Sequence, residues 1–305
     1  MTPSLPEYLV FGEALTDFIR QDDGSWQAHP GGACWNVARV GARLGVATAF
    51  AGSVSQDIFG SQLAQLSCEA GLDARYLQQL PHSPLLAMVP STRPPRYFFV
   101  GDDSADLHFD PSLLPEGWQA AARIVHFGCI SLARPPLADR LVELALSLAA
   151  AGKRIAFDPN FRAPMASPGY RAVFAAIAAV AHCIKVSDED LAGLFPGLDP
   201  AAALAELRVL APQAELLLTR GAEGMTLLHG GHEWVQPAFA VTVRDTVGCG
   251  DAAMGGWMAS RLLQPGADVQ THLRYAAATA ACAAAHTGAY APTRAEVETL
   301  LEGGR

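Results

Sequence analysis

The sequence has few charged residues and no excess of basic ones. Charged residues make up 17% of the 305 residues, and 21 basic residues stand against 30 acidic ones, which gives a net charge of −9. No basic cluster stands out, so we expect no surface for nucleic acid or for an anionic membrane. A polyphosphate ligand would need a metal ion and backbone dipoles to bind against this negative background.

Closely spaced cysteines and long apolar runs are also missing. The six cysteines lie far apart without a Cys-x-x-Cys pair, so the sequence predicts neither a zinc-binding cysteine motif nor a redox motif. The longest apolar runs, such as residues 172–184, fall short of the roughly 20 residues that cross a bilayer. The first residues lack a basic stretch followed by an apolar one, so we expect no signal peptide and a cytoplasmic protein.

Short β-rich runs alternate with longer segments rich in alanine and leucine. The pattern predicts strands at residues 8–14, 48–54, 123–128, 154–159, 183–187 and 215–221. It predicts helices at residues 34–45, 59–71, 136–152 and 170–181. Such alternation is typical of βαβ units, so we expect an α/β fold with a mostly parallel central sheet covered on both faces.

Three stretches depart from this alternation. Residues 13–29 and 83–101 have Asp-Gly or Pro-rich turns between extended runs, which predicts hairpins that add a small β-sheet to one edge. Residues 190–212 are typical of two short helices around a Pro/Gly turn. No linker or internal repeat divides the chain, so we expect one domain over residues 1–305.

A glycine-rich turn precedes Asp251 where an apolar helix begins. Gly248, Cys249 and Gly250 would expose backbone N–H groups at the positive end of the helix dipole, a favourable place for an anion. Asp251 could be a base toward a hydroxyl whose product binds there. It could equally be a helix N-cap or a first-turn aspartate with a structural role alone. The turn alone leaves both readings open.

A second glycine pair precedes another predicted helix. Gly31 and Gly32 would let the backbone approach a ligand closely, and Asn36 offers both a donor and an acceptor. Glycine pairs before helices are common, and Asn36 could simply be a cap. This cluster alone therefore does not establish a binding site.

Taken together, the two clusters resemble motifs of the ribokinase (PfkB) family of sugar and nucleoside kinases. The stretches are GGACWNVARVGARLG at residues 31–45 and DTVGCGD at residues 245–251. AGSVSQDIFG at residues 51–60 and LLTRGAEGM at residues 217–225 extend the likeness. Four further stretches look most like fructokinases: GEALTDF at 12–18, SADLHF at 104–109, HFGCISLA at 126–133 and FDPNFR at 157–162. The resemblance implies a ribokinase-like three-layer α/β/α fold whose small β-sheet is a lid.

The resemblance also implies roles for individual residues. Asp251 takes the place of the catalytic base, and the N–H groups of Gly248, Cys249 and Gly250 take the place of the anion hole. The residues placed at the sugar are Asp17, Gly31, Gly32 and Asn36, with Arg96 and Phe98 from the lid. The residues placed at the nucleotide are Arg162, Ser187, Thr219, Gly221 and Gly224. The segment 275–289, rich in small residues, is placed at the adenine.

The implied cofactors are ATP, Mg²⁺ and a monovalent cation such as K⁺. Asp190 stands where the family has a glutamate that organises Mg²⁺ through water, and its side chain is one methylene shorter. An alternative reading makes residues 188–190 a solvated helix start. The loop 245–247 is the place implied for K⁺. Cys249, beside a helix N-terminus, could have a lowered thiol pKa, or it could be a small residue whose backbone alone matters.

The implied reaction is phosphorylation of a primary hydroxyl, with D-fructose giving fructose 6-phosphate as the first expectation. The alternatives are 2-keto-3-deoxygluconate, a nucleoside or aminoimidazole riboside as acceptor, or a catalytically silent sugar-binding protein. The only partners expected are the small-molecule sugar and, through the lid, a second copy in a homodimer.

Overall fold

A large twisted sheet forms the centre of the protein, in a computed structural model that describes residues 4–92 and 95–303. Across this part of the chain its strands run in the order β13 (His232–Gln236), β12 (Met225–His229), β11 (Glu215–Thr219), β10 (Cys183–Ser187), β9 (Arg154–Asp158), β8 (Ile124–Gly128), β1 (Tyr8–Phe11), β4 (Thr48–Ser55) and β5 (Leu77–Leu80). Pairing is parallel from β11 to β5, whereas β12 and β13 are antiparallel. The predicted mostly parallel sheet and its six predicted strands are confirmed; β5, β12 and β13 had not been predicted.

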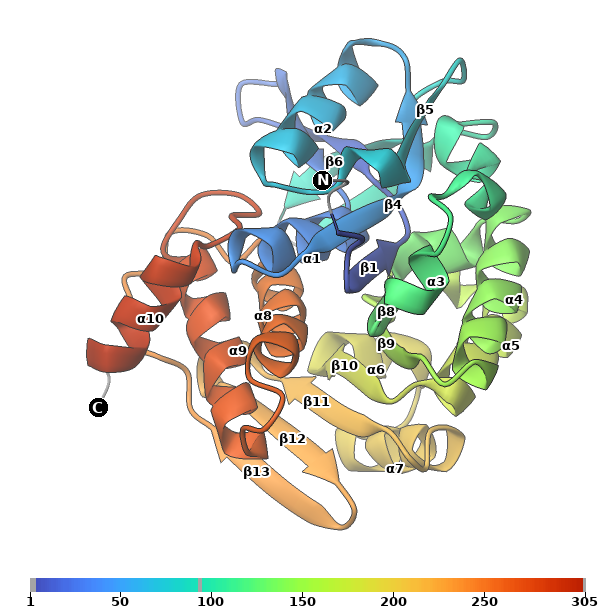
Figure 1. Ribbon diagram of the computed structural model, residues 1–305. Helices are drawn as coiled ribbons and strands as arrows, with labels where there is room; N and C mark the ends of the chain where they lie inside the picture. The colour runs from blue at the N-terminus through green and yellow to red at the C-terminus, as the bar shows by residue number, and fades with distance from the viewer. Residues whose placement is uncertain (1–3, 93–94, 304–305) are drawn as a thin grey trace.

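Helices cover both faces of this sheet (Figure 1). One apolar cluster involves α1 (Ala33–Arg43), α2 (Ile58–Glu69), α8 (Cys249–Leu263), α9 (Val269–Ala284) and α10 (Arg294–Gly303). The other involves α3 (Trp118–Ala121), α4 (Leu137–Ala150), α5 (Pro168–Val180), α6 (Asp188–Leu194) and α7 (Pro200–Leu210). Tyr8 and Val10 of β1 pack in the first cluster, whereas Leu9 and Phe11 pack in the second. Burial on both faces explains why this strand is apolar without alternation.

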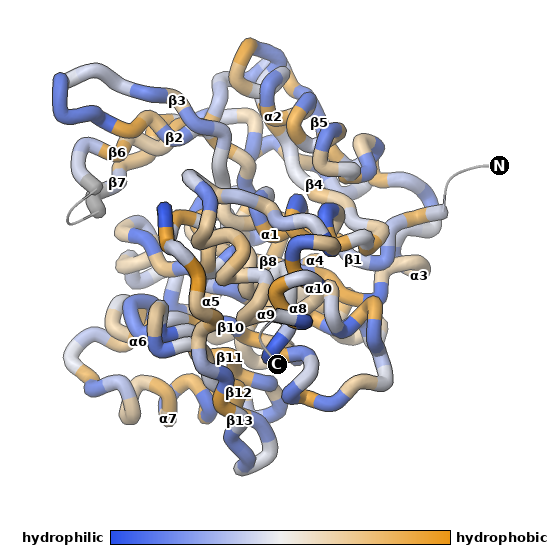
Figure 2. Tube along the Cα trace, turned by 90° about the vertical axis from the view of Figure 1, so that its left-hand side faces the viewer, coloured by the Kyte–Doolittle hydropathy of each residue, from blue (hydrophilic) through white to orange (hydrophobic). Residues whose placement is uncertain are grey.

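The predicted small sheet is present and lies beside the main body. Its order is β3 (Trp26–Gly31), β2 (Leu15–Arg20), β6 (Leu86–Thr92) and β7 (Pro95–Val100). β2 pairs antiparallel with β3 and parallel with β6, which pairs antiparallel with β7. In Figure 2 the strands project from the body, and the turn between β2 and β3 is hydrophilic. None of the described helices combines the length and apolar character that crossing a bilayer requires.

Helix α8 approaches its neighbours closely because it carries a glycine pair. A β-carbon at Gly255 would lie 2.7 Å from the Val40 side chain, and one at Gly256 would lie 2.5 Å from Thr279 Oγ1. Glycine costs helix stability when exposed, but here it allows α8 to pack against α1 and α9. The glycines therefore fix the position of the helix that begins at the Asp251 turn.

We predict that Gly256→Ala destabilises the protein by about 1–3 kcal/mol, because the added methyl overpacks the contact with Thr279. The matched control is Gly169→Ala in α5, where an added β-carbon meets no atom within 4 Å. The control should be neutral or stabilise by up to about 1 kcal/mol through helix propensity. Urea unfolding of both variants provides the measurement. Equal stability of the two would contradict this account of the contact.

Candidate active site

The predicted site residues gather at the carboxyl ends of the parallel strands. Asp158 ends β9, Ser187 ends β10 and Thr219 ends β11. Ser187 and Thr219 are directly opposite each other in the parallel register. This is the edge at which open α/β sheets bind ligands, since loops and helix N-termini converge there.

Asp251 lies in the first turn of α8, at the same edge. The N-cap position belongs to Gly248, whose φ of +75° is left-handed and whose β-carbon would lie 2.8 Å from Ala289 Cα. Asn36 Nδ2 donates to Asp251 Oδ2 at 2.9 Å, in the protein interior. The two glycine clusters, far apart in sequence, are therefore joined by a buried hydrogen bond. Glycines hold both N-cap positions, so neither Asn36 nor Asp251 is an N-cap, whereas Asp251 does lie in the first turn of α8, as its alternative reading predicted.

Burial raises the pKa of Asp251 to about 7, and the nearby Asp158 carboxylate contributes in the same direction. The hydrogen bond from Asn36 and the positive charges of Lys185 and Arg162 oppose this shift. A carboxyl group with this pKa can exchange a proton near neutral pH, which suits a general base.

Lys185 is a buried cation beneath the Asp251 turn. Its Nζ lies 3.1 Å from Asp158 Oδ2 and 3.7 Å from Asp190 Oδ2. A β-carbon at Gly250 would lie only 3.1 Å from the same nitrogen, so the ammonium faces the first turn of α8. Sequence reasoning had missed both Lys185 and Asp158. The sequence carried one signal for this pair: Lys185 is a single lysine in a mostly apolar strand, and a lysine buried there needs a partner of opposite charge.

Asp190 is held in a capping box with Ser187. The Ser187 amide donates to Asp190 Oδ2 at 2.8 Å, and the Asp190 amide donates to Ser187 Oγ at 3.0 Å. The Phe161 amide donates to Asp190 Oδ1 at 2.7 Å. Asp190 is only 4% exposed, so the solvated-helix-start interpretation fails for this residue, although it fits the exposed Asp188 and Glu189.

The residues predicted at the sugar meet where β2 and β3 approach α1. A β-carbon at Gly31 would lie 2.2 Å from Asp17 Oδ2, so a larger residue there would displace this carboxylate. Gly32 has a φ of +110°, and its β-carbon would lie 2.6 Å from the Glu13 carbonyl oxygen. Burial raises the pKa of Asp17 to about 6; Arg162 opposes this shift and Glu13 adds to it.

Glu13 is a further buried carboxyl group that sequence reasoning had missed. It accepts hydrogen bonds from the Ala33 amide at 3.1 Å and from Ser131 Oγ at 2.6 Å. It is 1% exposed, and burial raises its pKa. Glu13 therefore holds the start of α1 through the Ala33 amide, next to the Gly31–Gly32 turn.

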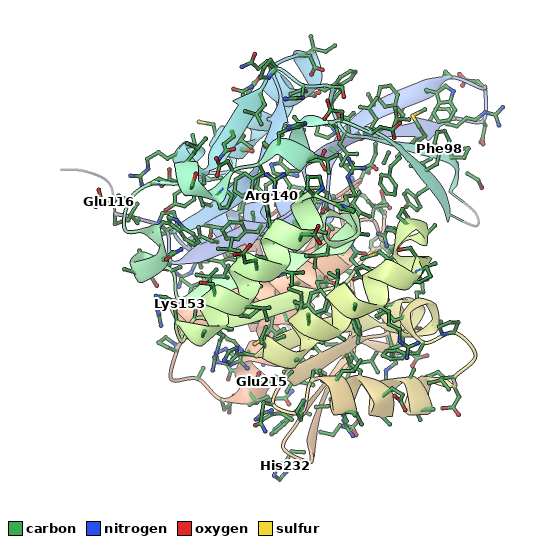
Figure 3. The ribbon with its side chains drawn as sticks, turned by 90° about the vertical axis from the view of Figure 1, so that its right-hand side faces the viewer. Phe98, Glu116, Arg140, Lys153, Glu215 and His232 are labelled. Carbon is green, nitrogen blue, oxygen red and sulfur yellow. The ribbon has the colours of Figure 1, made fainter. Side chains whose placement is uncertain are left out.

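Arg162 connects the small sheet with the floor of the site. Its guanidinium lies 5.4 Å from the centre of the Tyr97 ring in β7, and it donates to the carbonyl oxygens of Phe161 and Asn160. Phe98, on the opposite face of β7, is 53% exposed (Figure 3), so Tyr97 is the β7 residue that faces Arg162. Arg96 belongs to β7, but its side chain lies outside the described residues.

The residues predicted at the nucleotide follow β11. Thr219 Oγ1 donates to the Val186 carbonyl oxygen at 3.5 Å, across to β10. Gly221 and Gly224 have φ values of +51° and +94°, and a β-carbon at Gly224 would lie 2.2 Å from the Gln236 carbonyl oxygen. The turn thus requires glycine at position 224. Thr219 lies opposite Ser187, so these two predicted nucleotide residues are on adjacent strands.

Cys249 differs from one of the two readings of its sequence context. Burial raises the pKa of its thiol to about 11, with Asp245 and Asp251 adding to the shift, so the expected lowering of this pKa is wrong. Its amide donates to the Thr246 carbonyl oxygen at 3.2 Å. Cys249 N–H is therefore engaged in the turn, which leaves the amides of Gly248 and Gly250 as the better placed of the three for an anion.

Comparisons with known proteins agree with this geometry. The model of the pfkB family of carbohydrate kinases matches residues 6–296. A fructokinase of Klebsiella pneumoniae is 30% identical over 255 residues, which are 82% of each chain. The crystal structure of a Xylella fastidiosa fructokinase with bound ATP superposes with a TM-score of 0.87 at 28% identity, covering 98% of this chain and 99% of the other.

A second solved structure is also similar. It is an aminoimidazole riboside kinase from Salmonella enterica, complexed with aminoimidazole riboside and an ATP analogue, with a TM-score of 0.83 at 27% identity, covering 96% of this chain and 99% of the other. The family match spans both glycine clusters and the strand ends between them. The fold, the site and these matches agree: the chain belongs to the pfkB family of carbohydrate kinases, phosphotransferases that act on an alcohol group.

Proposed function

We propose that this protein transfers the γ-phosphoryl group of ATP to the primary hydroxyl of D-fructose, giving fructose 6-phosphate. The observation that carries the proposal is the buried pairing of Asp251 with Asn36, because it places a carboxyl group of pKa about 7 beside a helix N-terminus. Two of the three relatives described above are named fructokinases, which supports the choice of acceptor.

Asp251 would accept the hydroxyl proton as the oxygen attacks phosphorus. Phosphoryl transfer needs little early deprotonation, so positioning and charge stabilisation dominate. The Gly248 and Gly250 amides at the start of α8 would receive the developing charge, with Cys249 shaping the turn. Lys185 faces this turn from below, and its ammonium adds a buried positive charge where negative charge accumulates.

The sugar would bind between Asp17 and Asn36, over Gly31 and Gly32. Carboxylate and amide groups can each bond two hydroxyls, which suits a polyol. Arg96 is still proposed as a lid contact. Phe98, predicted with it, lies on the face of β7 turned away from Arg162, so Tyr97 takes its place as the lid residue proposed to face the sugar. The small sheet would act as a lid that excludes water from the reacting phosphate.

The nucleotide would lie along the ends of β10 and β11, against Ser187, Thr219, Gly221 and Gly224, with Arg162 at its phosphates. The loop after α9 passes Gly248 and would border the adenine. Asp190 would hold Mg²⁺ through water: each of its oxygens accepts one backbone amide and retains a lone pair. Bound Mg²⁺ would neutralise phosphate charge.

A monovalent cation, assembly and location complete the proposal. The Asp245 carboxylate accepts from the Val247 and Gly288 amides, which orders the loop 245–247 proposed for K⁺. Trp26, Phe98 and Val100 of the small sheet are exposed, which supports a homodimer through the lid. The proposed location is the cytoplasm.

A second candidate acceptor is aminoimidazole riboside, favoured by the Salmonella enterica structure described above. We predict ADP release with Mg-ATP and fructose, at a kcat/KM at least tenfold above ribose, 2-keto-3-deoxygluconate, nucleosides and aminoimidazole riboside. A coupled ADP-release assay over this panel is the measurement. A higher value with another acceptor would replace fructose, and no release with any acceptor would favour the silent sugar-binding alternative.

Asp251→Asn should lower kcat by about 10²–10⁴-fold, the range expected for loss of a general base. ATP binding, measured by calorimetry, should stay within a few-fold. The matched control is Asp139→Asn, an exposed first-turn aspartate of α4, which should keep full activity. Activity of Asp251→Asn equal to that of this control would exclude Asp251 as the base.

The same substitution should stabilise the unliganded protein at alkaline pH. The pKa of Asp251 is about 7 in the folded state, compared with 3.8 for an isolated aspartate, so the folded state binds the proton more tightly than the unfolded state. Its charge therefore destabilises the fold increasingly as pH rises from about 4 to 7, by up to about 4 kcal/mol at about 1.4 kcal/mol per pKa unit.

Asp251→Asn should thus have a higher Tm than the wild type at pH 8, and the difference should shrink toward pH 4. Thermal unfolding across this pH range, with Asp139→Asn alongside, measures it. A wild type that is as stable as Asp251→Asn at pH 8 would show that the carboxylate is not costly in the fold.

A further inference from the structure

Three side chains of metal-ligand type meet where the small sheet joins the body. His82 lies between β5 and β6, Asp103 follows β7, and His108 ends the short 3₁₀ turn Ala105–His108. One ligand atom from each lies within 4.8 Å of the other two. None of the three is among the residues proposed for the kinase reaction.

The backbone holds two of these residues in register. Ser83 and Ser104 form an isolated parallel β-bridge, and the Ala105 amide donates to the Ser83 carbonyl oxygen at 2.9 Å. The residues that precede this bridge, His82 and Asp103, therefore lie side by side. Backbone pairing alone brings these two residues together, so their proximity does not depend on a contact between their side chains.

Two arginines fix the segment that carries Asp103 and His108. Arg134 Nη2 donates to the Gly101 carbonyl oxygen at 2.6 Å and to Ser104 Oγ at 2.8 Å. Arg140 of α4, labelled in Figure 3, donates to the carbonyl oxygens of Phe109, at 2.8 Å, and of Leu107. The backbone that carries Asp103 and His108 is thus held in place, as a ligand site requires.

Both imidazoles face the same carboxylate. His108 Nε2 lies 2.5 Å from Asp103 Oδ1, and His82 Nδ1 lies 3.6 Å from Asp103 Oδ2. The two rings stack with centroids 3.6 Å apart and planes inclined by 15°. A surface ion pair needs one imidazole and contributes about 0–1 kcal/mol. Two protonated rings in this stack would repel each other, whereas two neutral rings leave two nitrogens next to a carboxylate, the donor set that zinc prefers.

We propose that His82, Asp103 and His108 bind one Zn²⁺ ion, with water as the fourth ligand. Zinc–ligand distances of about 2.0–2.2 Å place tetrahedral ligand atoms about 3.4 Å apart. The ligand atoms now lie within 4.8 Å of one another, so small side-chain rotations bring them to this spacing. The side chains are 30%, 77% and 39% exposed, so they can rotate and the ion can enter from solvent. The ion would cross-link the two segments by which β6 and β7 leave the body.

The test uses the full chain, purified without a polyhistidine tag and stripped with chelator. Zn²⁺ is titrated in competition with a chromogenic chelator, and Tm is recorded with and without the metal. We expect one tight site per chain and a Tm that rises with Zn²⁺. His82→Gln, Asp103→Asn and His108→Gln should each weaken binding at least about tenfold, since even partners of ligands cost about 10- to 100-fold. The exposed Asp103 makes Asp103→Asn the variant least able to disturb folding.

Two controls separate this site from other surface groups. The double variant His229→Gln/His232→Gln removes another exposed histidine pair, and Cys68→Ser removes an exposed thiol; both should bind Zn²⁺ like the wild type. The Co²⁺ complex of the wild type should lack a thiolate charge-transfer band. The proposal is overturned if the wild type binds no tighter than Asp103→Asn, or if either control loses the site.

Discussion

The hydrogen bond between Asn36 and Asp251 joins the two halves of the site. It spans 215 positions of the chain at 2.9 Å and is buried. Its geometry depends on the close packing of α1 against α8, which Gly255 permits. Burying a carboxyl group without a hydrogen-bond partner would cost several kcal/mol of folding free energy. The side-chain amide of Asn36 therefore both stabilises the fold and orients the Asp251 carboxyl group.

The rest of the site is arranged around charges that the interior holds at a cost. Asp158, Lys185 and Asp190 are each no more than 4% exposed, and they form a connected group. Burial raises the pKa of Asp158 to about 6, and the two carboxylates hold the pKa of Lys185 above its ordinary value. Pairs of this kind contribute little net stability. These charges lie next to the glycine turn at the start of α8, and this position explains their presence better than a contribution to stability does.

Much of this arrangement could be predicted from the sequence. The apolar runs gave the parallel strands, and the glycine clusters gave the turns at both helix starts, because glycine is required where φ is positive or where a β-carbon would clash. Residues such as Lys185 and Glu13 could not be placed, since their role depends on partners from other strands. The β12–β13 hairpin was missed although the sequence carries its turn: Gly230 and Gly231, with φ values of +57° and +80°, form the two-residue loop between the paired His229 and His232.

The thiol pKa of Cys249 shows a second limit of sequence reasoning. A helix N-terminus favours the thiolate, but here burial raises the pKa of the thiol, and the negative charges of Asp245 and Asp251 add to the shift. The sequence shows the helix start but does not show which charges surround it. The same is true of His82 and His108, which look like isolated histidines along the chain.

Arg162 shows how the two sheets communicate. Its guanidinium lies over the Tyr97 ring of the small sheet. Its positive charge opposes the rise in pKa that burial causes at Asp17 and at Asp251. One guanidinium therefore acts on a carboxyl group from each side of the site. Because groups in one electrostatic network are not independent, changes at Tyr97, Asp17 and Asp251 should not be additive. The proposed closure of the small sheet and the proposed proton transfer at Asp251 would therefore share one structural element, the Arg162 guanidinium.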